Sequence, residues 1–162
     1  MKTLLIISDL FDNEVIIMKA TVLYYSHTGR TAAYAREIAM YLWSKGLDVS
    51  LSSISDFDKQ RLLKSDIVFS GCWTCGWFVI GQHPHRKWID FSKSVAGFMD
   101  ERKVMFFTTY KIRTGSMHRR MRKAMNMTGK GVSGFLKSKT ARLTDEDKTE
   151  LDTFIQSNML TK

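Results

Sequence analysis

The 162-residue sequence predicts an α/β protein with a five-stranded parallel sheet covered by helices on both faces. Short apolar runs alternate with helical patterns five times from Ala20 onward. The central runs 67–69 and 104–107 are apolar at every position, as expected for strands buried on both faces. The first run, 22–25, leads directly into a hydroxyl-rich loop and a helix. This alternation indicates parallel strands joined by right-handed crossovers.

The expected elements follow from apolar spacing, which has a period near 3.6 in helices and runs or alternates in strands. In chain order they are strand 22–25, helix 29–45, edge strand 48–54, a short helix from 56 to 64, strand 67–69, a helix from 84, strand 104–107, a helix from 116, a weak strand at 131–136 and a last helix from 144.

Residue types that begin helices support these boundaries. Asp56 is expected to cap the short helix, and Pro84 can occupy the first position of the next one. Ser116 precedes the fourth helix. Thr144 with Asp147 three residues later is typical of a capping box.

The helices after Pro84 carry apolar stripes that we expect to face the sheet. The stripe of the first of them consists of Trp88, Phe91, Val95 and Phe98. The next has Met117, Met121, Ala124 and Met125, and the last has Leu151, Phe154 and Ile155.

Composition favours one folded, cytoplasmic domain over residues 18–162. Hydrophobic residues make up 44% and charged residues 25% of the chain, which is a globular composition. No apolar run reaches the ~18 residues that a membrane span needs. Residues 1–17 look like an N-terminal extension, too short and too soon acidic for a signal peptide, in which 4–7 and 15–18 could each form a short strand. Two cysteines do not make a disulfide framework.

The net charge of +9 is concentrated in one part of the chain. Between Lys103 and Thr144 there are eleven Lys or Arg residues and no Asp or Glu, so the remainder is slightly acidic. Such a window predicts a surface with a field of one sign. We expect a basic face from Lys111 to Arg142, with Arg86 and Lys87 nearby, and an acidic partner for it. Nucleic-acid binding is disfavoured, because aromatic residues are few in this window and no binding motif is present.

A hydroxyl-rich loop joins the first strand to the first helix. It consists of Ser26, His27, Thr28, Gly29, Arg30 and Thr31. The unpaired N–H groups and the positive dipole end of a helix N-terminus suit a phosphate. Ser26, Thr28 and Thr31 add hydroxyl donors, and Gly29 allows close backbone approach. The alternative is a turn that only caps an ordinary helix.

The pattern Ser/Thr-x-Thr-Gly-x-Thr after a first strand resembles the FMN-phosphate loop of the flavodoxin family. The resemblance covers about residues 18–158. It implies a doubly wound sheet with strand order 2-1-3-4-5, with FMN bound where the first and third strands end. It also implies that residues 26–31 hold the phosphate, with Arg30 adding a charge.

The stretch GCWTCGWF at 71–78 is expected to be a loop beside the phosphate loop. In the family this loop lies against the flavin ring. The residues that it would contribute are Trp73, Thr74, Cys75, Gly76 and Trp77. Trp73 or Trp77 could stack on the ring, although each could equally be packed beneath the loop. The peptide after Thr74 or Cys75 would lie near the flavin N5.

The loop at 108–115 corresponds to the family's second ring wall, for which Thr109 and Tyr110 are the candidates. In the family this loop is usually acidic, whereas here it contains Lys111, Ile112 and Arg113. Reduced flavin carries negative charge, which nearby cations stabilise. We therefore expect a less strongly reducing flavin than in an acidic flavodoxin.

Cys72 and Cys75 have the C-x-x-C spacing of a redox dithiol. The sequence offers no second cysteine pair for zinc, and His83 and His85 complete no convincing tetrahedral set. We expect two small residues that fill space near the cofactor, and no metal.

Two functions from different classes fit the sequence. The first is an FMN electron carrier that docks an acidic redox partner through its basic face. The second is an FMN-dependent oxidoreductase, of the quinone reductase or protoporphyrinogen dehydrogenase type, acting on a small molecule. The absence of a long insertion that could form a substrate lid favours the carrier.

Overall fold

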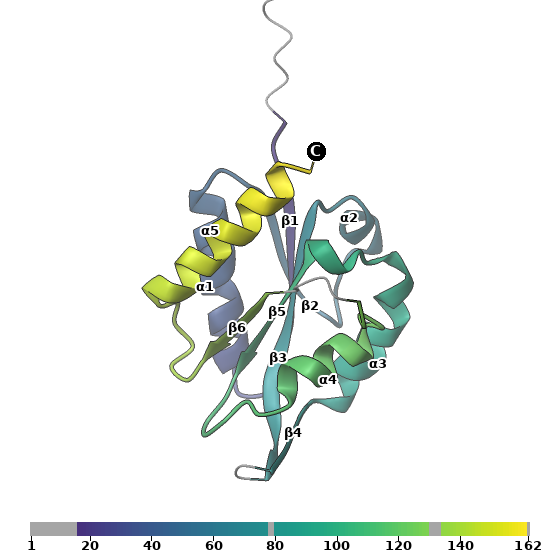
Figure 1. The fold of residues 1–162 in the computed structure, drawn as a ribbon, viewed down its shortest axis with the longest axis vertical. Coiled ribbons are helices and arrows are strands. Elements are labelled where there is room, and N and C mark those ends of the chain that lie inside the picture. Colours follow the sequence, from purple (N-terminus) through teal and green to yellow (C-terminus); the bar gives the residue numbers. More distant parts are fainter. Residues whose placement is uncertain (1–15, 78–79, 130–133, 162) are drawn as a thin grey trace, which may run out of the picture.

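The computed structural model describes residues 16–77, 80–129 and 134–161, which form a sheet between two layers of helices (Figure 1). The strands are β1 (Lys19–Tyr25), β2 (Asp48–Ser53), β3 (Ile67–Trp77), β4 (Ile80–Pro84), β5 (Val104–Thr109) and β6 (Phe135–Ser138). The α-helices are α1 (Arg30–Ser44), α2 (Lys59–Leu63), α3 (Arg86–Val95), α4 (Met117–Ala124) and α5 (Asp145–Met159). Five strands are parallel in the order β2-β1-β3-β5-β6, which confirms the predicted order, and β2 is the predicted edge.

The central strands bury apolar side chains on both faces of the sheet, as predicted. Val22 and Phe69 belong to the core under α1 and α5, whereas their neighbours Leu23 and Val68 belong to the core under α2, α3 and α4. Successive residues of a strand face opposite ways. Figure 1 shows the two groups of helices on opposite sides of the sheet. The fold is therefore doubly wound.

The last two helices begin where the sequence predicts. Ser116 precedes α4, whose Met117 and Met121 are fully buried. At the start of α5, the Thr144 hydroxyl accepts the Asp147 N–H at 3.1 Å, and the Asp147 carboxylate accepts the Thr144 N–H at 2.9 Å. This reciprocal pair is the predicted capping box.

The predicted cap of α2 is wrong by two residues. Asp58, not Asp56, accepts the N–H groups of Gln60 and Arg61, at 2.8 and 3.3 Å. Phe57 packs edge-to-face on the core ring of Phe91, with centroids 5.0 Å apart. This contact holds Phe57 against the core, so the helix begins only after Asp58.

The predicted loop over 71–78 is also wrong, because residues 71–77 continue β3. Trp73 is the last β3 residue paired with β5, opposite Thr109. Beyond it β3 pairs antiparallel with β4, and the register shifts between Cys75 and Trp77. Gly76 lies in that irregularity with φ of 134°, a conformation that favours glycine. The β3–β4 pair thus extends the sheet past its carboxyl edge.

Pro84 ends β4 instead of opening α3. It lies opposite Thr74 on a strand that has one described neighbour, where a missing N–H is tolerated. His85 takes the cap position, and its Nδ1 accepts the Lys87 N–H at 3.2 Å.

The expected stripe of α3 holds for Trp88, Phe91 and Val95, which are buried, but not for Phe98, which is 49% exposed. Residues 96–98 form a 3₁₀ turn. The tighter winding of this turn rotates Phe98 away from the stripe.

Two further expectations fall partly outside the described residues. Residues 16–18 precede β1 without regular structure, so the described part of the proposed strand 15–18 is absent, and 1–15 lie outside. The described part of the weak fifth strand predicted at 131–136 is β6, which begins at Phe135, whereas 131–133 lie outside the described residues. Within the described ranges, every helix is too short or too polar to cross a bilayer.

Candidate functional site

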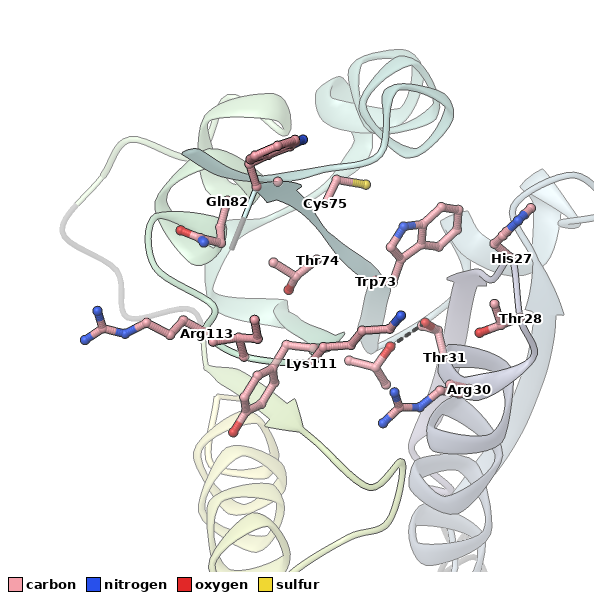
Figure 2. A pocket seen from close by; sticks show the side chains of 15 residues that line it. His27, Thr28, Arg30, Thr31, Trp73, Thr74, Cys75, Gln82, Lys111 and Arg113 are labelled. Carbon is pink, nitrogen blue, oxygen red and sulfur yellow. Dashed lines mark hydrogen bonds between the residues drawn. The ribbon is translucent and has the colours of Figure 1, made fainter. Parts of the chain in front are cut away.

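A cleft of about 480 Å³ opens at the carboxyl edge of the parallel strands. Three segments line it: the loop after β1 with the start of α1, the β3–β4 pair, and the segment after β5. Figure 2 shows labelled side chains from all three around one opening. The predicted residues in the lining are His27, Thr28, Arg30, Thr31, Trp73, Thr74, Cys75, Gly76, Trp77, Thr109 and Tyr110. Ser26 and Gly29 lie in the same loop but outside the lining.

The loop after β1 presents the N-terminus of α1. Gly29 occupies the cap position with φ of 85°, and no side chain caps this helix among the described residues. The Ser26 hydroxyl oxygen accepts the Gly29 N–H at 3.1 Å, which leaves its O–H able to donate elsewhere. The first turn of α1 contains no acidic residue. An uncapped helix start beside hydroxyls is suited to an anion.

Hydrogen bonds join this loop and the start of α1 to β5 and to the residue after β6. The buried hydroxyls of Thr31 and Thr109 are 2.7 Å apart and form a hydrogen bond in which either one can donate (Figure 2). The Arg30 guanidinium donates to the carbonyl oxygen of Lys139, just after β6. The start of α1 is therefore held against the carboxyl ends of β5 and β6.

The two candidate ring-stacking tryptophans have different surroundings. Trp73 is half-buried and packs against three rings: Tyr25 at 5.1 Å, His85 at 4.8 Å and His27 at 5.7 Å between centroids. Trp77 is 82% exposed at the rim of the cleft. Trp73 thus forms a fixed wall, whereas Trp77 stands at the opening.

The histidine beside Trp73 has a lowered pKa. Burial lowers the pKa of His85 most, and the nearby positive charge of Lys87 lowers it further. Its Nδ1 acts as an acceptor for α3, which requires an unprotonated nitrogen.

Cys72 and Cys75 point to opposite sides of β3. Cys72 is buried in the core under α3 and α4, whereas Cys75 lines the cleft. Residues three apart in a strand have Cα atoms about 10 Å apart, beyond the ~7 Å limit for a disulfide. Burial raises the pKa of both thiols. This geometry argues against a dithiol couple, and the described residues bring together no group of three metal-ligating side chains.

We therefore expect Cys75 to react slowly with a thiol reagent in the folded protein and Cys72 not to react. The rate at Cys75 should rise with pH, since a raised pKa leaves little thiolate at neutrality. Thiol counting before and after denaturation measures this. A Cys72–Cys75 disulfide formed reversibly by mild oxidant, detected by mass, would contradict the strand geometry.

Four lining residues were not among the predicted site residues: Gln82, Lys111, Ile112 and Arg113. Gln82 is buried on β4, and its backbone carbonyl accepts the Ser116 hydroxyl at 2.8 Å. It was missed because β4 itself was missed. The other three stood out in the sequence as a basic departure from the family's acidic loop, and this signal could have placed them at the site.

The lining contains three cations, Arg30, Lys111 and Arg113, and no carboxylate among the described residues. It combines a helix N-terminus and hydroxyls at one end with tryptophans and Tyr110 elsewhere. Its volume lies within the range of ligand sites. The donor set thus fits a phosphorylated, flat aromatic molecule.

In doubly wound sheets, ligands bind outside the carboxyl ends of the strands, where the strand order reverses. Here the order reverses between β1 and β3. The loop after β1 and the end of β3 both line the cleft. The fold and cleft define a mononucleotide-binding α/β protein. The family model of flavodoxin matches residues 22–135. The chain belongs to the flavodoxin family, whose members bind FMN and transfer electrons.

Known relatives agree in sequence and in fold. The chain is 30% identical to a flavodoxin of Clostridium beijerinckii over 109 residues, which cover 67% of this chain and 76% of that protein. The reduced flavodoxin of Megasphaera elsdenii has a similar fold, with a TM-score of 0.67 at 22% identity, over 85% of this chain and 98% of that one. Flavodoxin 2 of Bacillus cereus gives 0.62 at 20% identity, over 89% and 99%.

Proposed function

We propose that this protein is an electron carrier that holds FMN in the cleft and docks an acidic redox partner through its basic rim. The phosphate would lie at the N-terminus of α1, against residues 26–31. The ring would lie between the β3 residues 73–77 and Tyr110. FMN, when bound, supplies the one-electron chemistry, and this chain binds it, orients it and sets the charge around it.

The observation that carries this proposal is the cleft itself, which joins an uncapped helix N-terminus to an aromatic wall. Backbone N–H groups and hydroxyls there suit a phosphomonoester dianion. The Thr31–Thr109 hydrogen bond holds the helix start against the strand that leads to Tyr110. The phosphate site and the ring site would therefore be held at a fixed position relative to each other.

The basic rim supports the choice of an acidic partner. Lys111, Arg113 and Lys139 are exposed beside or near the cleft. In the described part of the window 103–144, salt bridges are limited to Arg122 with Glu101. The remaining cations keep their field, which would steer an acidic protein toward the cleft.

We also propose a cytoplasmic location. Cys72 and Cys75 are both free thiols, as is usual in a reducing compartment.

The cationic rim is expected to raise the second one-electron reduction potential of bound FMN above that of the C. beijerinckii flavodoxin measured in parallel. A solvent-exposed charge at about 6 Å contributes roughly 1 kcal/mol after screening, or about 40 mV for one electron. The variant Lys111→Gln/Arg113→Gln should lower the potential by about this amount for each charge removed. Spectroelectrochemical titration measures it.

Lys45→Gln is the matched control, because Lys45 follows the opposite end of α1 and pairs with Asp152. Its potential should equal that of the wild type. A wild-type potential as low as that of the relative, or no change in the double variant, would contradict the proposed role of the rim.

One observation favours a second candidate, a flavin-dependent oxidoreductase acting on a small molecule. The β3–β4 pair extends beyond the sheet and contributes Trp77 and Gln82 to the cleft, so a projecting strand pair lies beside the site and could contact a substrate. Steady-state turnover of NAD(P)H with a quinone, without any added protein, would favour this enzyme. Reduction that needs a separate reductase protein would favour the carrier.

A further inference from the structure

Exposed apolar side chains gather at the opening of the cleft. Trp77 and Ile80 on the β3–β4 pair are 82% and 78% exposed, and Ile112 in the segment after β5 is 52% exposed. Trp77 and Ile112 line the same cleft. The β3–β4 pair forms one end of the long axis of the molecule (Figure 1). Large apolar side chains exposed together at one end of a protein indicate a contact surface.

Cations lie next to Ile112 and against β4. Lys111 and Arg113 flank Ile112 and are exposed. Arg120 of α4 donates to the Ser116 hydroxyl at 3.2 Å, and that hydroxyl donates to the Gln82 carbonyl, which places Arg120 against β4. No carboxylate lines the cleft among the described residues. The exposed apolar side chains Trp77, Ile80 and Ile112 thus have positively charged neighbours.

We propose that this end of the molecule binds the surface of an anionic lipid bilayer, with Trp77, Ile80 and Ile112 entering the headgroup region. Trp is favoured at the membrane interface, and each nearby Lys or Arg strengthens attachment to anionic lipid. The cleft would then open toward the bilayer. This inference goes beyond the proposed electron carrier. Lys111 and Arg113 would serve both occupants in turn, so the acidic partner would meet the cleft only when the protein is off the bilayer. Contact through Ile80, which lies outside the cleft lining, does not depend on FMN.

Two features favour lipid over a second protein as the occupant of the apolar side chains Trp77, Ile80 and Ile112. The apolar side chains come from two segments on either side of an opening, whereas a protein hot spot is a packed central patch. The flanking charges are of one sign, which matches the uniform charge of an anionic leaflet. A bilayer also requires no shape complementarity.

The test is co-sedimentation with vesicles of phosphatidylcholine alone and of phosphatidylcholine mixed with phosphatidylglycerol. We expect binding only to the anionic vesicles, weakened by salt. Ile80→Ser should lower the partition coefficient on the order of tenfold. Lys111→Gln/Arg113→Gln should lower it about fivefold for each cation. Ile80 lies outside the cleft lining, so its variant leaves the proposed FMN site untouched.

Trp43→Ser is the matched control for Trp77→Ser, because Trp43 is 73% exposed but lies on α1, away from the cleft. It should bind vesicles as the wild type does, whereas Trp77→Ser should bind weakly. Thermal unfolding of each variant verifies the fold. No binding to anionic vesicles, equal binding to both vesicle types, or binding unchanged by both Ile80→Ser and Trp77→Ser would overturn the proposal and leave the patch to a protein partner.

Discussion

Ser26→Ala/Thr28→Ala is expected to lower FMN affinity on the order of 10²- to 10⁴-fold, because each hydrogen bond to a charged group contributes about 1.5–3 kcal/mol. Both hydroxyls belong to the loop that presents the N-terminus of α1. The variant leaves the buried Thr31–Thr109 hydrogen bond in place, so the loop stays anchored to β5. Calorimetric titration of the apoprotein with FMN measures the loss.

Riboflavin separates the phosphate from the ring. Because it lacks the phosphate, its affinity should change little in the same variant. Thr149→Ala/Thr153→Ala removes two hydroxyls that donate to carbonyl oxygens of α5, away from the cleft, and it should bind FMN like the wild type. If FMN and riboflavin lose affinity equally in the loop variant, the loop does not hold the phosphate.

Gly71→Ala is expected to destabilise the fold by about 3 kcal/mol or more, at the upper end of overpacking effects. Gly71 lies on β3 opposite Phe107 of β5, and an added Cβ would overlap the ring and the carbonyl oxygen of Phe107. Phe107 cannot yield easily, because its ring is fully buried and packs edge-to-face on Tyr34 of α1. The next residues of both strands lead into the cleft, so FMN affinity should fall as well.

Urea unfolding measures the loss in free energy of unfolding, and thermal unfolding should show a decrease in melting temperature of about 6–12 °C. Gly97→Ala is the matched control, because no atom lies within 4 Å of its added Cβ and its φ is not positive. That variant should be neutral or slightly stabilised. A Gly71→Ala protein within 1 kcal/mol of the wild type would show that the β3–β5 spacing adjusts to a side chain, against the ~3 kcal/mol expected.

Sequence patterns predicted most of the parallel sheet because its signals are local. A strand that is buried on both faces must be apolar throughout, as at 67–69, and a helix start needs a nearby acceptor, as at Thr144. The loop 26–31 was also recognisable, since its chemistry is contained in consecutive residues. These features require no knowledge of distant contacts.

The β3–β4 pair was missed because its signals are not local. Gly76 and Pro84 favour a loop and a helix start when each is considered alone. In the structure Gly76 lies in a bulge and Pro84 ends a strand. Both roles depend on the pairing of β3 with β4, and no sequence pattern indicates that these two segments pair. Gln82 was lost from the predicted site for the same reason. The opposite orientation of Cys72 and Cys75 likewise follows only once 71–77 is a strand.

The central claim is that FMN binds in the cleft with its phosphate at the N-terminus of α1. A crystal structure of the protein with FMN tests it most directly. We expect the phosphate against the backbone N–H groups of residues 27–31 and the ring between residues 73–77 and Tyr110. A phosphate located elsewhere, or a cleft that remains empty at saturating FMN, would contradict the account.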